Sequence, residues 1–152
     1  MTYTRIRIQN RAYDFLHQNH GQQGFELMLF VRPARRLNTL LRPSPREEVA
    51  RVTVHAPNAD ELLVNALGLG YARIRMRVRH AHRSQGMGGW LLEHALREAH
   101  TLNLGLAGEL QALQLERAQA FYVNHGARIV ARPLHPGHPW VVWDVPNLQR
   151  RG

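Results

Sequence analysis

The segment RSQGMG, residues 83–88, is followed by a further glycine and has the residue types of a phosphate-binding turn. Alternating residues before it (71–80) and a leucine-rich stretch after it (87–103) predict that it joins a strand to a helix. The unpaired N–H groups of a helix N-terminus attract anions, and glycines let the backbone close around a phosphate. Arg83 would add a positive charge. The alternative is a tight turn that binds no ligand.

Four arginines precede this turn at every second position, and they alternate with Ile74, Met76 and Val78. In a strand they all project from one face: Arg73, Arg75, Arg77 and Arg79. A face lined by four arginines cannot be an apolar core. Three alternatives remain open at this point, namely a solvated face, a face paired with acids, and the wall of a substrate cleft.

All 20 basic residues of the chain are arginine, against 11 acids, which gives a net charge of +9. This charge would attract the phosphates of nucleic acid, of an anionic membrane or of a cofactor, and an arginine-rich coding bias is the alternative explanation. Because the chain contains no Lys, a Walker loop is excluded. The G-x-G-x-x-G spacing of a dinucleotide fingerprint is also missing.

A chain of 152 residues with 44% hydrophobic residues predicts one globular domain. No apolar run reaches the ~20 residues that span a bilayer, and MTYTRIRIQN at the start lacks the apolar core of a signal peptide. We therefore expect a cytoplasmic protein without a membrane partner. The absence of Cys excludes disulfides and Cys-ligated metals. The histidine spacings HAH (80–82) and HPGH (135–138) are not standard zinc patterns, so no metal is expected.

The hydrophobic periodicity and the turn residues predict a mixture of strands and helices. Strands are predicted at 3–9, 24–33, 48–57, 71–80, 108–114, 127–133 and 138–145. Helices are predicted at 10–21, with Asn10 as N-cap and Gly21 past its end, and at 58–70, 87–103 and 115–126, with a loop at 34–47. This order predicts an α/β or α+β fold with a central sheet.

Two segments resemble the GCN5-related N-acetyltransferases, the GNAT superfamily. MRVRHAHRSQGMGGWLL (76–92) resembles the family's motif A, in which a strand leads through R/Q-x-x-G-x-G/A into a helix. AQAFYVNHGARIV (118–130) resembles its A-x-x-F-Y-x-x-x-G-F segment, with Ala127 where the family usually has Phe. GHPW (137–140) resembles the G-x-P-H segment of the ElaA-type subgroup, with Trp140 in place of His.

The resemblance covers residues 71–145, whereas the first 70 residues match poorly and lack the VFVVEQ-like segment of the ElaA-type subgroup. It implies a single GNAT-like domain over 1–152, with a mostly antiparallel central sheet flanked by helices. Residues 1–70 would form a divergent N-terminal half and 71–145 the half that binds acetyl-CoA. It also implies an N-acetyltransferase that passes the acetyl group of acetyl-CoA directly to an amine acceptor.

The family's roles transfer to matching positions. The backbone of Val78 would meet the acetyl and pantetheine end of acetyl-CoA. The pyrophosphate would be held by the turn, mainly through N–H groups: Arg83, Ser84, Gln85, Gly86, Met87, Gly88 and Gly89. Tyr122 matches the general acid that protonates the departing CoA thiolate, and a phenol is protonated at neutral pH. The alternative for Tyr122 is a core residue of an amphipathic helix.

The general base is left open by the sequence. Some family members carry a Glu at the position of Ala72, so this role would pass to His80, Glu109, His138 or a chain of waters, or the amine would arrive neutral. In a cleft, the arginine face would favour an acidic acceptor, the 3′-phosphate of CoA, or tRNA.

Two other functions remain alternatives. One is a basic GNAT-fold protein that binds or modifies RNA, although no aromatic RNP motif is present. The other is a non-catalytic module that binds CoA. The apolar VVW segment (141–143) would allow strand pairing across a homodimer.

Overall fold

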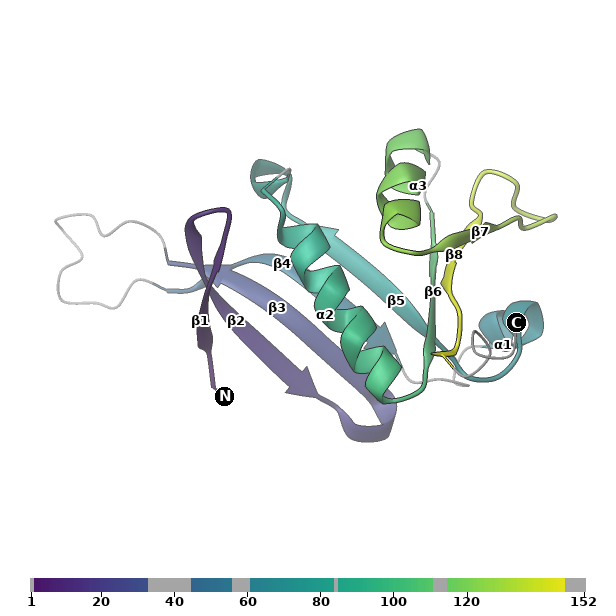
Figure 1. The fold of residues 1–152 in the computed structure, drawn as a ribbon, viewed down its shortest axis with the longest axis horizontal. Helices are drawn as coiled ribbons and strands as arrows, with labels where there is room; N and C mark the ends of the chain where they lie inside the picture. The colour runs from purple at the N-terminus through teal and green to yellow at the C-terminus, as the bar shows by residue number, and fades with distance from the viewer. Residues whose placement is uncertain (1, 33–44, 56–60, 84, 111–114, 147–152) are drawn as a thin grey trace, which may run out of the picture.

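The computed structural model describes residues 2–32, 45–55, 61–83, 85–110 and 115–146. Within them, eight strands form one sheet in the order β1-β2-β3-β4-β5-β6-β8-β7 (Figure 1). The strands are β1 Thr4–Ile8, β2 Arg11–Asn19, β3 Gly24–Val31, β4 Glu47–His55, β5 Tyr71–Val78, β6 Gly105–Glu109, β7 Arg128–Val130 and β8 Trp140–Trp143. The helices are α1 Glu61–Leu67, α2 Met87–Thr101, α3 Leu115–Asn124 and the short 3-10 turns η1 Gly21–Gln23 and η3 His80–His82. The neighbouring strands are antiparallel except β5 and β6, which confirms the predicted fold class.

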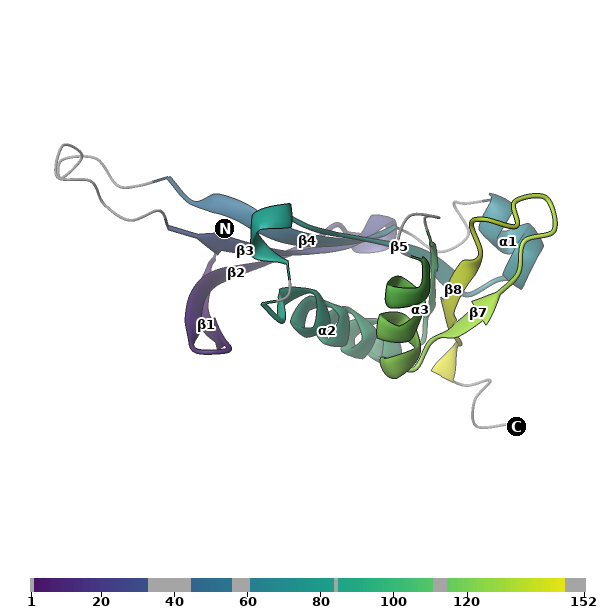
Figure 2. The same ribbon diagram turned by 90° about the horizontal axis from the view of Figure 1, so that it is seen from above.

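The main core lies between α2 and one face of the sheet. Figures 1 and 2 show α2 crossing this face, with α3 on the same side and α1 on the other. The buried side of α2 is the predicted apolar face: Leu91, Leu92, Ala95 and Ala99. Strand side chains alternate between faces, so Phe25, Leu27 and Leu29 of β3 pack toward α2. A second, smaller core joins Leu63 of α1 to the opposite face.

The helix predicted at 10–21 is wrong, because these residues form β2. Gln9 and Asn10 have φ values of 48° and 65° and make a two-residue turn between β1 and β2, so Asn10 is not a helix cap. Gly21 has a φ of 62° and lies in the turn to β3. Both faces of β2 bury apolar side chains. Apolar and polar residues therefore do not alternate along this segment as they do in a strand with one buried face.

The remaining predicted elements are largely confirmed. Strands form within 3–9, 24–33, 71–80, 127–133 and 138–145, and at 47–55 against the predicted 48–57; helices form within 58–70, 87–103 and 115–126. The strand predicted at 108–114 lies earlier, at Gly105–Glu109, where an added Cβ on Gly105 would come within 2.5 Å of the Tyr71 ring. The predicted loop at 34–47 is described only from 45 onward, and Asn58 and residues 111–114 lie outside the described residues.

One sheet runs through both halves of the chain. The pairing of β4 with β5, from Ala50↔Val78 to His55↔Arg73, joins residues 1–70 to residues 71–145. The apolar strand β8 lies between β6 and β7, so it has no free edge for pairing across a dimer. No helix in the described part of the chain is long and apolar enough to cross a bilayer.

Asp14 on β2 ties the N-terminal strands together. Its side chain is buried, with the residue 4% exposed, and accepts hydrogen bonds from Arg5, Arg32 and Arg46 at 3.0, 3.1 and 2.9 Å. Arg32 follows β3 and Arg46 precedes β4, so one carboxylate connects four strands. Burial alone would raise the pKa of Asp14, but these hydrogen bonds outweigh it and lower the pKa below 3.8.

We expect Asp14→Asn to lower the free energy of unfolding by about 2 kcal/mol at pH 7, because it leaves the arginines without a counter-charge. A carboxyl with a lowered folded pKa stabilises the fold above its unfolded pKa, and this contribution is lost as the pH falls through the folded value. The difference in the free energy of unfolding between wild type and variant should therefore be largest above about pH 5. It should shrink as the pH falls below 3.8.

Urea denaturation at pH 7 and at pH 3 measures this difference. The exposed Glu93→Gln on α2 is the control and should change stability by less than about 0.5 kcal/mol. A difference for Asp14→Asn that does not depend on pH would contradict the role of the charge.

Candidate active site

A cavity of about 1080 Å³ opens where β5 and β6 separate. The two strands pair from Tyr71↔Gly105 to Arg73↔Ala107, and β5 then continues to Val78. Within the described residues, no strand pairs with this part of β5 on the β6 side. The cavity is lined by β4, β5, the end of β6, α3 and β8, together with Arg83 and Leu92.

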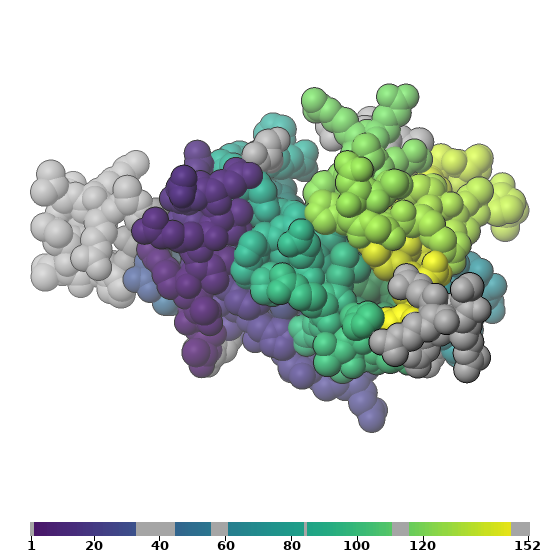
Figure 3. Space-filling view, in the orientation of Figure 1, coloured from purple at the N-terminus to yellow at the C-terminus, as the bar shows by residue number. Residues whose placement is uncertain are grey.

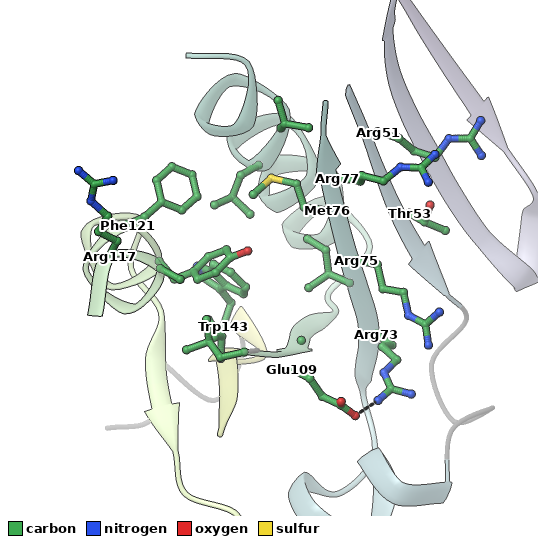
Figure 4. A pocket seen from close by; sticks show the side chains of 18 of the residues that line it. Arg51, Thr53, Arg73, Arg75, Met76, Arg77, Glu109, Arg117, Phe121 and Trp143 are labelled. Carbon is green, nitrogen blue, oxygen red and sulfur yellow. Dashed lines mark hydrogen bonds and ion pairs between the residues drawn. The ribbon is translucent and has the colours of Figure 1, made fainter. Parts of the chain in front are cut away.

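The cavity has an apolar wall and a basic wall, because β5 presents both of its faces there. Figure 4 shows Met76 pointing toward Phe121 of α3, whereas Arg75 and Arg77 leave β5 on the other side. Ile74 and Met76 belong to the core that packs on α2. The arginines face Thr53 and Arg51 on the paired strand β4.

The glycine turn lies at the apolar side of the cavity, where α2 begins. Gly86 precedes α2 with a φ of 81°, in the left-handed region that favours glycine. A Cβ added to Gly88 would lie 3.6 Å from Met76 Cε and 3.8 Å from Phe121 Cζ, so the first turn of α2 faces the cavity wall. The first N–H groups of a helix have no partner inside it, which makes this end an anion site in principle.

The predicted cofactor residues are not all in one place. Val78 and Arg83 line the cavity, and the guanidinium of Arg83 donates to the Val78 carbonyl at 3.4 Å. Gln85 lies in a separate hollow of about 230 Å³ beside the β1–β2 hairpin, where it accepts a hydrogen bond from Tyr13. The Met87 side chain is buried in the core, so only its backbone could contact a ligand. Ser84 lies outside the described residues.

Tyr122 of α3 lines the cavity with its ring held between two aromatic side chains. The centroids of Phe121 and Trp143 lie 5.2 and 5.7 Å from its own, both in edge-on arrangements. Among the described residues its hydroxyl has no hydrogen-bond partner, which leaves the O–H free to act as a donor into the cavity. Burial raises the pKa of Tyr122 above its ordinary value near 10. The phenol is therefore protonated throughout the neutral range.

Of the residues that the sequence offers as a general base, only Glu109 lines the cavity. Ala72 is fully buried and carries no polar group. Glu109 lines the cavity, where it pairs with Arg73 and lies 3.3 Å from Arg132. His80 is exposed in η3 and His138 bonds the Leu110 carbonyl through its ring, and neither lines the cavity. Among the described residues, no cluster of His, Asp or Glu could hold a metal ion.

The four arginines on and directly after β5 do not share one environment: some are paired with acids, some are exposed to solvent, and some line the cavity. Arg73 pairs with Glu109 and Arg79 with Glu47, so these two are neutralised. Arg77 lies 3.6 Å from Glu48 but its side chain is 79% exposed. Arg75 is exposed, lines the cavity and has no acidic partner among the described residues.

Sequence reasoning missed several residues of the cavity. Arg51 and Thr53 reach it because β4 pairs with β5. Trp143 reaches it from β8, where its indole N–H donates to the His125 carbonyl at 3.0 Å. Arg117 and Phe121 line it from α3. The F-Y dipeptide pointed to α3, but nothing in the sequence indicated that β4 and β8 would lie beside it.

Comparison with solved structures identifies the architecture. The GNAT domain of S. lividans PAT superposes with a TM-score of 0.66 at 12% identity, covering 93% of this chain and 96% of that one. Arabidopsis thaliana NAA60, solved in complex with acetyl-CoA, gives 0.57 at 15% identity, over 81% of this chain and 77% of that one. An acyl-CoA N-acyltransferase from Pseudomonas aeruginosa gives 0.52 at 23% identity, over 79% and 67%. No family model matches the sequence, and no curated protein is a significant match.

The two glycines at the start of α2 should respond in opposite ways to alanine. Gly86→Ala should lower the free energy of unfolding by about 1–2 kcal/mol, because its φ is left-handed and the added Cβ would lie 2.8 Å from Gln9 Nε2. Gly88→Ala makes only ordinary contacts within a helix and should leave stability unchanged or raise it by up to about 1 kcal/mol. Urea denaturation measures both, and equal effects would contradict this geometry.

Proposed function

We propose that this chain, which has the fold of the GNAT acetyltransferases, transfers an acetyl group from acetyl-CoA to an amine. The observation that carries the proposal is the cavity between β5 and β6, which lies beside the start of α2 and is lined by Tyr122. The comparison with NAA60 supports acetyl-CoA as the acetyl donor, because that protein was solved with it.

The start of α2 is suited to the pyrophosphate of acetyl-CoA. The N–H groups of Met87, Gly88 and Gly89 lie in the first turn of a 15-residue helix, and two of these residues lack a side chain. Arg83 is exposed, lines the cavity and supplies a positive charge without an acidic partner among the described residues. Figure 3 shows α2 and α3 adjoining on this face, with the N-terminal strands on the other side of α2.

The free edge of β5 is suited to the pantetheine arm. An extended chain with amide groups can add to a strand edge through backbone hydrogen bonds. Between Ile74 and Val78 this edge faces the cavity instead of a described strand. Met76 and Phe121 supply an apolar surface for the aliphatic part of the arm.

Tyr122 is suited to protonate the leaving sulfur. Acetyl-CoA supplies a thioester carbonyl; attack by a neutral amine forms an N–C bond and breaks the C–S bond. The sulfur then receives the Tyr122 proton, the proton released by the nitrogen passes to solvent, and solvent returns a proton to the Tyr122 phenolate. The raised pKa of Tyr122 keeps its proton available. Glu109, the one carboxylate among the described lining residues, is already paired with two arginines, and we assign it no proton transfer.

Arg83→Gln should weaken acetyl-CoA binding about tenfold, because it removes a charge-assisted contact to phosphate. Binding of acetyl-pantetheine, which lacks the phosphates, should not change. Calorimetric titration of both compounds into the wild type and Arg83→Gln measures the four dissociation constants. Gly88→Glu should weaken acetyl-CoA binding further, since it adds a carboxylate at the helix terminus.

The matched controls are Arg97→Gln, an exposed arginine farther along α2, and Gly88→Ala, and both should bind acetyl-CoA like the wild type. Equal acetyl-CoA affinity in the wild type, Arg83→Gln and Gly88→Glu would rule out the cofactor site at this turn.

Tyr122→Phe should lower kcat about 100-fold or more while leaving the Kd for acetyl-CoA within about twofold, because the phenol acts in the chemical step. The raised pKa also predicts no loss of activity from tyrosine ionisation below about pH 10. Tyr71→Phe is the control, because Tyr71 is buried, donates to Asp144 at 2.8 Å and does not line the cavity. Unchanged turnover in Tyr122→Phe would remove the acid role.

A further inference from the structure

Building on this proposed function, we propose that the acceptor is a small amine that also carries an anionic group, and that Arg75 and Arg77 bind this group. The basis is the juxtaposition of the two arginines with the cavity on the face of the sheet opposite α2. The amine would reach the thioester through the opening between β5 and β6, and the anionic group would stay on the arginine face.

The placement of the two side chains follows from the register of the strands. Arg77 pairs with Arg51 and Arg75 with Thr53 across β4 and β5, so all four side chains project from one face. Side chains two apart on a strand lie about 7 Å from each other. An anion between Arg75 and Arg77 can therefore contact both, with the Thr53 hydroxyl nearby as a further donor (Figure 4).

The local charge is not balanced by the protein. Arg51 is bonded to Glu48 and Glu26, and Arg73 to Glu109. By contrast, Arg75 has no acidic partner among the described residues, and Arg77 approaches Glu48 only at 3.6 Å. The positive groups of Arg75 and Arg77, two residues apart on β5, repel each other, and a bound anion would offset that repulsion. Arginine also suits carboxylate and phosphate groups, because its planar fork donates two parallel hydrogen bonds.

The phosphates of acetyl-CoA do not explain these two arginines. The start of α2 lies on the face toward which Ile74 and Met76 point, and Arg75 and Arg77 point away from it. On the arginine face, α1 packs through Leu63 against Tyr71, at the start of β5, whereas Arg75 and Arg77 lie farther along the strand and are exposed. The basic wall is thus accessible from the side opposite the proposed cofactor site, and the acceptor is the molecule left to occupy it.

The test uses protein saturated with CoA, so that only the acceptor side is free. The probes are ω-amino acids of increasing length, from glycine to 6-aminohexanoate, each paired with its uncharged amide, and the matching aminoalkylphosphonates. Calorimetry should show that acids bind at least about tenfold more tightly than their amides at the best length, as expected for charge-assisted hydrogen bonds. The phosphonate series shows whether carboxylate or phosphate geometry fits better.

Arg75→Gln should abolish the preference for acids without changing the affinity for amides, and Arg75→Lys should restore part of it. Arg7→Gln is the matched control, because Arg7 is an exposed arginine on β1 far along the sheet order from β5. This variant should keep the full preference. The same panel with acetyl-CoA should show the preference in kcat/KM for acetylation.

The outcomes separate the two proposals. If CoA does not bind, the proposed function fails and this inference falls with it. If CoA binds but acids and amides bind equally, or the preference survives in Arg75→Gln, only the inference is overturned. Arg75-dependent binding of a single-stranded RNA oligonucleotide, with no binding of any amino acid, would overturn it in favour of RNA as the partner.

Discussion

The position and the lining of the cavity both depend on the point at which β5 and β6 separate. Pairing stops after Arg73↔Ala107, and β5 runs on to Val78 beside an open cavity. A strand inside a complete sheet shows each face to a different layer, and its edges are occupied. A strand beside a gap exposes an edge and both faces to the same space. This is why one cavity has an apolar wall toward α3 and a basic wall toward β4.

The distribution of charge gives the gap its chemical character. The few acids of the chain neutralise particular arginines: Asp14 binds three in the N-terminal strands, and Asp144 binds Arg128 through two hydrogen bonds. Three arginines without a described acidic partner line the cavity, namely Arg75, Arg83 and Arg117. A coding bias toward arginine can explain how many arginines there are. It does not explain why three of the unpaired ones lie around the same opening.

The sequence predicts most elements of the fold but not β2, for a physical reason. In α2, and in β5 from Ala72 onward, one period dominates, because a single face is buried against the core. In β2, Tyr13 is buried toward α2 and Leu16 toward the opposite face, so the period of a strand is hidden and the segment resembles a helix. The turn and Tyr122 could be found from local motifs. Arg51, Thr53 and Trp143 could not, because they reach the cavity through pairing between distant strands.

The N-terminal half, although it shares no motif with the rest, helps to build the site in two places. The turn between β1 and β2 rests against the start of α2, where Ile8 and the Gln9 side chain lie so close to Gly86 that a Cβ there would touch both. The Tyr13 hydroxyl adds a hydrogen bond of 3.3 Å to Gln85, in the same turn. β4 then supplies the strand that sets the register of the arginine face. The proposed phosphate end and the proposed acceptor end of the cavity thus both depend on residues before position 70. Under the proposed function, substitutions before position 70 would change what the acceptor wall recognises, whereas the turn and Tyr122 lie on elements of the second half.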